Sequence, residues 1–173
     1  MSAFSHLRVS SEYSISQGLL TINQIVDNAS KKSIPSVALT DKSNMFGLVK
    51  FFDKCELAGI KPISGCSLNV IFDGDDDSHE LLCLAKTNNG HKNLMKIISS
   101  AHNNYSYSSP IIQFKDLTEL SDDIVIISGG KNSQIFEYLR RNKRADAENK
   151  IDQFTKYFKD DFVLEIQKTN RED

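Results

Sequence analysis

Short apolar runs alternate with amphipathic helical segments along most of this chain, and this alternation limits the possible folds more than any other feature. The apolar runs predict strands at residues 4–9, 36–40, 60–63, 68–72, 81–85, 124–128 and 162–166. The intervening segments predict helices that begin near residues 22 and 88 and helices over 44–58, 114–120, 133–142 and 145–158. Strands that alternate with helices favour parallel pairing through βαβ units, which gives an α/β fold with an open doubly wound sheet or a barrel.

Two local signals sharpen these boundaries. Thr21 and Gln24 have the spacing of a capping box, so a helix is expected to begin directly after Thr21. The stretch 102–109 is polar and predicts a loop, in which Tyr105 and Tyr107 could form a contact surface. The chain shows no internal repeat and no linker that would divide it, so we expect one domain.

Composition excludes several classes of protein. The net charge is −2 and the pI about 6.1, whereas chains that grip a nucleic-acid backbone usually carry a basic surplus. No apolar run approaches the length of a membrane helix, and the first residues lack the features of a signal peptide. The three cysteines lie in apolar surroundings at unrelated spacings, which favours buried, reduced thiols in a cytoplasmic protein over a reactive thiol.

Three polar motifs each allow a structural and a functional interpretation. Residues 128–131 (SGGK) follow a strand and could cradle a phosphate, but the spacing of a Walker loop is missing and a plain turn is favoured. The basic run at 140–144 lies among acidic residues and is typical of a solvated helix face, with a phosphate- or protein-binding patch as the alternative. The acidic turn at 73–77 resembles a calcium loop only in its acidity.

The four histidines lack the i, i+4 spacing of a helical metal site. His6 lies within a strand signal and is expected to be a hydrogen-bonded structural residue. His79 borders the acidic turn and is either a surface residue or a displaced metal ligand. His91 and His102 lie on and after a helix and are expected to face solvent.

Several blocks of this chain resemble the PHP (polymerase and histidinol phosphatase) domain of bacterial replicative DNA polymerase III alpha subunits. The first three are residues 6–20 (HLRVSSEYSISQGLL), 38–51 (ALTDKSNMFGLVKF) and 58–70 (AGIKPISGCSLNV). The later blocks, in the same order as in the family, are 84–86, 90–94, 110–112, 127–130 and 164–169. The resemblance covers nearly the whole chain and is strongest to the proteobacterial form, in which the metal site is eroded.

The resemblance also locates the family's metal-ligand positions. In PHP enzymes, histidines and carboxylates hold metal ions that activate a water and neutralise charge on a phosphoester. Those positions fall here on seven residues that form a predicted vestigial metal pocket: Arg8, Ser10, Gln17, Asp41, Lys42, Ser67 and Glu80. Because guanidinium and ammonium groups cannot ligate a metal, we expect no catalytic residue and no metal or other cofactor in this chain. Arg8 and Lys42 are instead expected to pair with Asp41, Glu12 or Glu80.

For the fold, the resemblance implies a distorted seven-stranded β/α barrel, incomplete here, with residues 1–173 forming the PHP part of a longer polymerase chain. For function, it implies a non-catalytic scaffold that docks the separate epsilon proofreading exonuclease within the polymerase III holoenzyme. The magnesium-dependent polymerase core and most DNA contacts would lie downstream, and no membrane would be involved. A barrel that lacks its last segment would expose a strand edge, so self-association is expected.

Two alternatives remain open from the residues. A rearranged set of His6, Asp41, His79 and Glu80 would make the chain a metal-dependent phosphoesterase or 3′–5′ exonuclease. A pocket between Arg8 and Lys42 would bind an anion such as sulfate or phosphate where metals once sat.

Overall fold

A long β-hairpin forms the centre of the fold. In the computed structural model, which describes residues 4–103 and 109–167, strands β2 (Lys61–Ile71) and β3 (Ser78–Ala85) pair antiparallel over residues 65–71 and 78–84. The connection at residues 72–77 is far too short for the crossover that parallel strands need. The expectation of parallel βαβ pairing is therefore wrong at this point, and the sheet is mixed.

The other strands extend the hairpin on both sides. β1 (Ser36–Leu39) pairs parallel with the start of β2, and β4 (Ile112–Gln113) pairs parallel with its end. β5 (Ile124–Ile127) pairs antiparallel with β3, and β6 (Phe162–Val163) pairs parallel with β5. Within the described residues this gives a six-stranded sheet in the order β1-β2-β3-β5-β6, with β4 also on β2.

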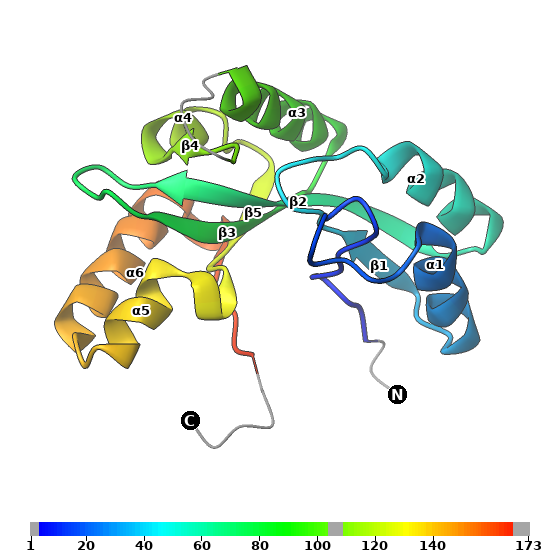
Figure 1. Cartoon of the computed structure of the whole chain (residues 1–173), viewed down its shortest axis with the longest axis horizontal. Coiled ribbons are helices and arrows are strands. Elements are labelled where there is room, and N and C mark those ends of the chain that lie inside the picture. The colour runs from blue at the N-terminus through cyan, green and yellow to red at the C-terminus, as the bar shows by residue number, and fades with distance from the viewer. Residues whose placement is uncertain (1–3, 104–108, 168–173) are drawn as a thin grey trace.

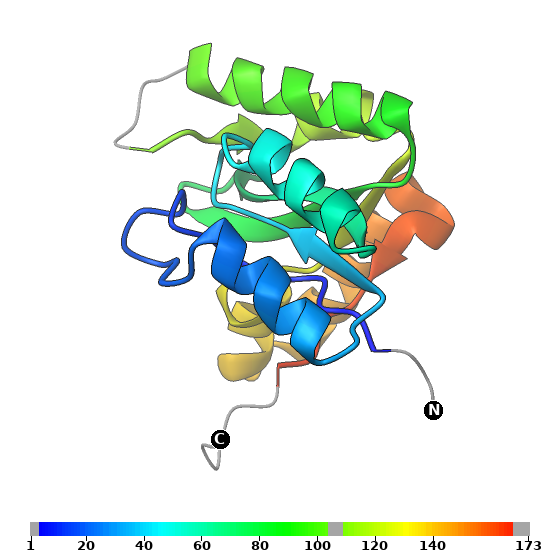
Figure 2. The same ribbon diagram turned by 90° about the vertical axis from the view of Figure 1, so that its right-hand side faces the viewer.

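Helices surround the curled sheet on three sides (Figures 1 and 2). In Figure 1, α1 and α2 lie on the right, α3 and α4 above the hairpin, and α5 and α6 on the left. The first and last described residues both lie on the remaining, lower side of Figure 1. The bounds of the helices are Ile22–Lys31 (α1), Leu48–Leu57 (α2), Asn88–Asn103 (α3), Phe114–Glu119 (α4), Gln134–Arg140 (α5) and Arg144–Phe158 (α6), with 3₁₀ turns at Gly130–Asn132 (η1) and Lys159–Asp161 (η2).

Alternation along the strands separates an outer core from an inner face. Outward-facing residues of the hairpin, such as Leu68 and Cys83, pack with α3, α4, α5 and α6 around an aromatic cluster that includes Phe72, Phe114 and Phe154. A second cluster lies under α1 and α2. The inner face carries a smaller cluster of Ala38, Leu82, Leu84 and Ile127. The polar residues of the candidate site are on this inner face.

Most predicted elements are present with shifted ends. The capping box of Thr21 and Gln24 is confirmed at the start of α1. The strand predicted at 4–9 is reduced to a single bridge between His6 and Val37, although Thr40 N also donates to the Val9 carbonyl over 2.8 Å. The helix predicted from residue 44 begins at Leu48, because the Asn44 side chain binds loop backbone instead.

Two further strand predictions can be compared with the structure. The two strands predicted at 60–63 and 68–72 form the single strand β2, and the strand predicted at 162–166 is only two residues long. The loop tyrosines at 105 and 107 lie outside the described residues.

The cysteines are buried, as predicted. Cys55, Cys66 and Cys83 all have free thiols in the apolar core. Burial raises the pKa of Cys55 to about 11 and that of Cys83 to about 12, and it also raises the pKa of Cys66. Because the thiolate is the reactive form, these thiols are inert near neutral pH.

Candidate functional site

The candidate site is a polar cluster on the inner face of the sheet. In the β2–β3 register, Ser67 lies opposite Leu82 and Asn69 opposite Glu80. Directly paired residues of antiparallel strands project to the same face, so Ser67 and Glu80 share the face that carries the inner apolar cluster. The pleat of the hairpin thus brings two of the predicted pocket residues to one surface.

Arg8 joins two carboxylates in this cluster. Its Nε and Nη2 atoms donate to the two carboxylate oxygens of Glu165 over 2.8 and 2.6 Å, and its Nη1 donates to Glu80 Oε1. The side chains of Arg8, Glu80 and Glu165 are 27%, 7% and 16% exposed. A bidentate guanidinium–carboxylate pair fixes geometry as well as charge. The predicted pairing of Arg8 with Glu80 is confirmed, whereas Glu12 lies 3.7 Å from Lys50 instead.

The charges of this cluster depend on one another. Burial lowers the pKa of Arg8, but hydrogen bonds to Glu165 and Glu80 more than offset that effect, so its pKa lies above the usual value. Burial raises the pKa of Glu165, but hydrogen bonds from Arg8 and Gln167 bring it below the usual value. Both groups are therefore charged at neutral pH, and the guanidinium offsets the negative charge of Glu165 while it also donates to Glu80.

Three residues that the sequence analysis missed complete the cluster. Glu165 lies just after β6, and its backbone N–H donates to Ser128 Oγ over 2.9 Å. Asn132 Nδ2 donates to Glu80 Oε2 over 3.1 Å, and Gln167 Nε2 donates to Glu165 Oε1 over 3.0 Å. Their sequence separations from Arg8 exceed 120 residues, so only the resemblance of block 164–169 to the family pointed toward this end of the chain.

Asp41 is also buried, but its carboxylate binds Ser11 and Ser14, whereas that of Glu80 binds Arg8. One carboxylate oxygen accepts from Ser11 N (2.7 Å) and Ser14 Oγ (2.6 Å), and the other from Ser11 Oγ (2.8 Å). These bonds fold the loop after residue 10 onto the end of β1. The carboxylate predicted as a possible partner of Arg8 is thus committed to the loop.

The remaining pocket residues are held by backbone contacts. Lys42 and Ser67 form an isolated parallel bridge, and Ser67 N donates to the Asp41 carbonyl over 3.1 Å. Gln17 is exposed on the loop, and Ser10 is partly buried. The structure therefore brings Arg8 and Glu80 into direct contact and joins Asp41, Lys42 and Ser67 through backbone, whereas Gln17 N donates to the Ser14 carbonyl of its own loop over 3.0 Å.

The rearranged histidine and carboxylate set is not assembled. His79 and Glu80 are consecutive residues of β3 and so project to opposite faces of the sheet. His79 Nδ1 lies 3.6 Å from Glu137 on α5, and His6 is exposed with its ring edge-on to Phe4. Residues 4–103 and 109–167 contain no group of three or more His, Cys, Asp or Glu residues arranged to hold a metal ion.

The other two histidines were expected to face solvent, and this is only partly correct. His91 Nδ1 lies 2.8 Å from Ser64 Oγ and is half-buried, so the prediction is wrong for His91. His102 is exposed, yet its Nε2 lies 2.9 Å from the Ser43 carbonyl.

The structure favours the structural interpretation of the turn at 128–131 and of the basic run at 140–144. At residues 128–131, an added Cβ on Gly129 would lie 1.8 Å from the Glu80 carbonyl oxygen, and one on Gly130 would meet Gln167, so protein atoms already fill the turn. In the basic run, Arg141 pairs with Glu137 and Arg144 with Glu148, both at i, i+4 on the helix surface. This matches the solvated helix face that the sequence favoured.

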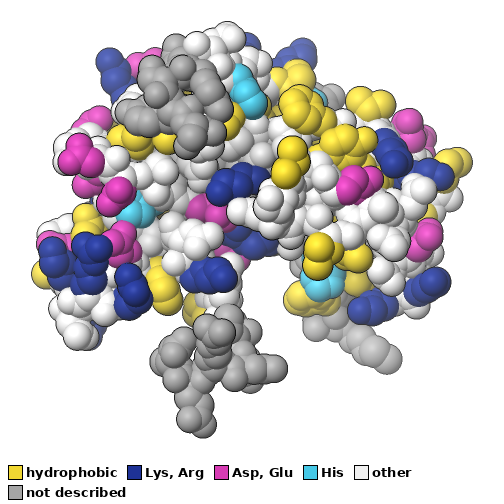
Figure 3. Space-filling view, viewed as in Figure 1, with side chains coloured by type: hydrophobic (Ala, Val, Ile, Leu, Met, Phe, Trp, Pro, Cys, Tyr) yellow, Lys and Arg dark blue, Asp and Glu magenta, His cyan; other side chains and the backbone are white. Residues whose placement is uncertain are grey.

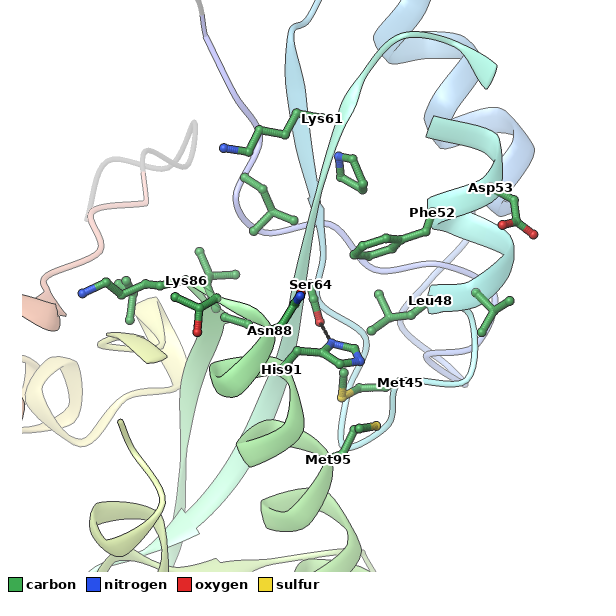
Figure 4. Close-up of a pocket in the computed structure, with 17 residues that line it drawn as sticks. Met45, Leu48, Phe52, Asp53, Lys61, Ser64, Lys86, Asn88, His91 and Met95 are labelled. Carbon is green, nitrogen blue, oxygen red and sulfur yellow. Dashed lines mark hydrogen bonds between the residues drawn. The ribbon is translucent and has the colours of Figure 1, made fainter. Parts of the chain in front are cut away.

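A second feature, absent from the sequence analysis, is a groove of about 830 Å³ between α2 and α3 (Figure 4). Its walls carry Leu48 and Phe52 from α2 and Met95 from α3, with Met45 at one end. The hydrogen-bonded pair of Ser64 and His91 spans it from β2 to α3.

Comparison with known proteins defines the class of this chain. The family model of the PHP domain matches residues 6–169, and the chain belongs to the PHP domain family. It is 38% identical over 173 residues to the DNA polymerase III subunit alpha of Escherichia coli (strain K12), and 36% identical over 176 residues to that of Borreliella burgdorferi. These alignments cover 98% and 96% of this chain but 15% of each relative.

Among solved structures, an amidohydrolase from Chromobacterium violaceum matches with a TM-score of 0.47 and 22% sequence identity, over 58% of this chain and 34% of that chain. Within the described residues, no helix is both long enough and apolar enough to cross a membrane.

The ligand positions of the family do not fit a metal ion in this chain. A guanidinium occupies the place of the first histidine pair and binds Glu80 and Glu165 itself. The oxygens of Asp41 already accept three hydrogen bonds. A divalent ion would have to displace Arg8 from its carboxylates. The positive charge of Arg8 would also repel the ion, and in a partly buried site this repulsion opposes binding.

Proposed function

We propose that this chain is a non-catalytic PHP domain that serves as a scaffold and partner-docking module of a replicative DNA polymerase III alpha subunit. Its partner is the epsilon proofreading exonuclease, which docks on the PHP domain in the polymerase III holoenzyme of a bacterial cytoplasm. The magnesium-dependent nucleotidyl transfer and most DNA contacts belong to other parts of the polymerase.

The observation that carries the proposal is the position of the Arg8 guanidinium between Glu80 and Glu165. An internal cation holds together carboxylates that come from β3 and from the end of the described chain. The guanidinium links these carboxylates as a bound cation would, but it cannot ligate a water and activate it as a metal ion does. The relationship to polymerase alpha subunits supports placing such a domain in DNA replication.

The phosphoesterase alternative has less support. It requires His6, Asp41, His79 and Glu80 to converge, and these residues lie on different faces or are committed to other contacts. The anion-binding alternative requires a free Arg8, whereas three of its nitrogen atoms donate to carboxylates.

The test is binding of the epsilon subunit from the same bacterium by isothermal titration calorimetry. The chain is first shown to unfold cooperatively in urea, so that a negative result cannot be attributed to an unfolded sample. We expect a saturable one-to-one complex to form in a buffer that contains no DNA. Absence of binding by a cooperatively folded chain would contradict the docking function.

A further inference from the structure

The groove between α2 and α3 arises from a split in the sheet. Residues 61–64 of β2 pair with β1, whereas β3 joins β2 only from Gly65 onward. Before Gly65, the half of the sheet formed by β1 and β2 therefore separates from the half formed by β3 and β5. The helices α2 and α3, which lie over these halves, are separated in the same way. Ile63, Leu84 and Val125 line the base of the groove, and Ile63 and Val125 are only partly buried.

Several large apolar side chains in and beside the groove are exposed. Val49, Phe52 and Met95 line it and are 76%, 38% and 44% exposed, and Phe46 beside it is 73% exposed. In Figure 3, hydrophobic side chains gather over α2 and beside α3, on the upper right. A concentration of large apolar side chains around a concave surface marks a binding site, whereas single exposed ones are ordinary.

The α3 wall and the α2 wall of the groove differ in charged side chains. The α3 sequence contains no Asp or Glu, and Lys92 and Lys96 are exposed without a carboxylate partner among the described residues. Lys92 follows Asn88 by four residues and precedes Met95 by three, so on the surface of α3 it is a neighbour of two residues that line the groove. The one acidic residue that lines the groove, Asp53, is on the α2 wall.

We propose that this groove receives a segment of the partner polypeptide that presents large apolar side chains to its base and carboxylates to α3. The inference rests on the proposed docking function and assigns a surface to it. Apolar anchors supply the affinity of such an interface, and the lysines on its edge guide association and orientation.

The methionines provide a direct probe of occupancy. The chain has three, of which Met45 and Met95 line the groove and Met1 lies outside the described residues. In a chain labelled with ¹³C-methyl methionine, titration with the epsilon subunit is expected to shift or broaden the Met45 and Met95 signals in proportion to complex formation.

Two variants test the walls separately. Val49→Glu places a charge in the groove at an exposed position, and is expected to weaken binding at least about tenfold. Lys92→Glu combined with Lys96→Glu is expected to weaken binding about threefold or more and to reduce its salt dependence. Leu139→Glu on α5, which changes a comparably exposed apolar residue away from the groove, is expected to leave binding within twofold.

The outcomes separate this inference from the function on which it rests. If epsilon binds without changing the Met45 and Met95 signals, and Val49→Glu binds normally, the docking function stands and the groove assignment is overturned. If epsilon does not bind at all, both fail. Changes in the two signals that follow the concentration of the chain alone would assign the groove to a second copy and would also overturn the inference.

Discussion

Arg8 lies between carboxylates from distant parts of the chain, and its removal leaves two partly buried negative charges close together. We expect Arg8→Met to lower the free energy of unfolding by about 2–3 kcal/mol, below the range for a fully buried pair because Arg8 is partly exposed. Urea denaturation at pH 7 measures this. Arg144→Met breaks a pair on the exposed helix surface and serves as the control, with an expected loss much smaller than that of Arg8→Met.

A rescue experiment identifies the cause. Adding Glu80→Gln and Glu165→Gln to Arg8→Met removes the uncompensated charges and is expected to recover part of the lost stability. If the triple variant is less stable than Arg8→Met, the effect comes from packing of the arginine side chain instead of from charge.

The residues of this cluster show where sequence reasoning stops. The resemblance to the PHP family gave the ligand positions, and side-chain chemistry at Arg8 and Lys42 then predicted an eroded metal site, because neither can be a ligand. The partner Glu165 could not be inferred in this way, since it lies 157 residues from Arg8 and approaches it only when the sheet curls. Asp41 was placed in the predicted pocket, but its three bonds to Ser11 and Ser14 depend on the loop conformation.

At the scale of elements, the turn between β5 and η1 positions the network. Gly129 has φ +86°, and an added Cβ would lie 1.8 Å from the Glu80 carbonyl oxygen. Gly74 has nearly the same φ, +84°, with no atom within 4 Å of an added Cβ. We expect Gly129→Ala to cost about 3 kcal/mol and Gly74→Ala about 1 kcal/mol, both measured by urea denaturation. Equal losses would show that backbone conformation alone matters at Gly129.

The contact of β3 with α5 predicts a pH dependence of stability. Burial lowers the pKa of His79 and Lys150 lowers it further, whereas Glu137, Asp75 and Asp77 raise it, and the net shift is downward. The unfolded chain therefore binds the proton more tightly. Stability from this group is complete above the unfolded pKa, about 6.5, and is lost as the pH falls through the lower folded value.

His79→Gln removes this titration. The free energy of unfolding of the variant is expected to change less than that of the unmodified chain as the pH is lowered from 7 toward 5, as followed by urea denaturation at each pH. A variant with an unchanged slope would show that other groups cause the acid sensitivity.

The pattern of elements was predicted better than their pairing. Periodicity located the helices and most strands, because burial of one face dictates the spacing of apolar residues. It did not reveal that β2 is continuous through Gly65 or that β3 returns antiparallel, since the direction of a strand depends on the length of the connection and on tertiary pairing. The groove was missed because it results from the divergence of β1–β2 from β3–β5.

At the scale of the whole molecule, the N-terminal segment and β6 border the side of the curled sheet that the helices leave free (Figure 1). Arg8 and Glu165 connect the two borders through side chains. The self-association expected at a free strand edge stays a prediction, which sedimentation velocity over a range of concentrations would examine.

The central claim is that an internal guanidinium has replaced the metal ions of the PHP site. The most direct measurement is elemental analysis of the chain after equilibration with Mn²⁺ and Zn²⁺ and removal of free ions, together with hydrolysis of bis-p-nitrophenyl phosphate. We predict metal well below one equivalent and no hydrolysis above the metal-only control. Stoichiometric metal that supports hydrolysis, and whose binding is lost in Asp41→Asn or Glu80→Gln, would contradict the account.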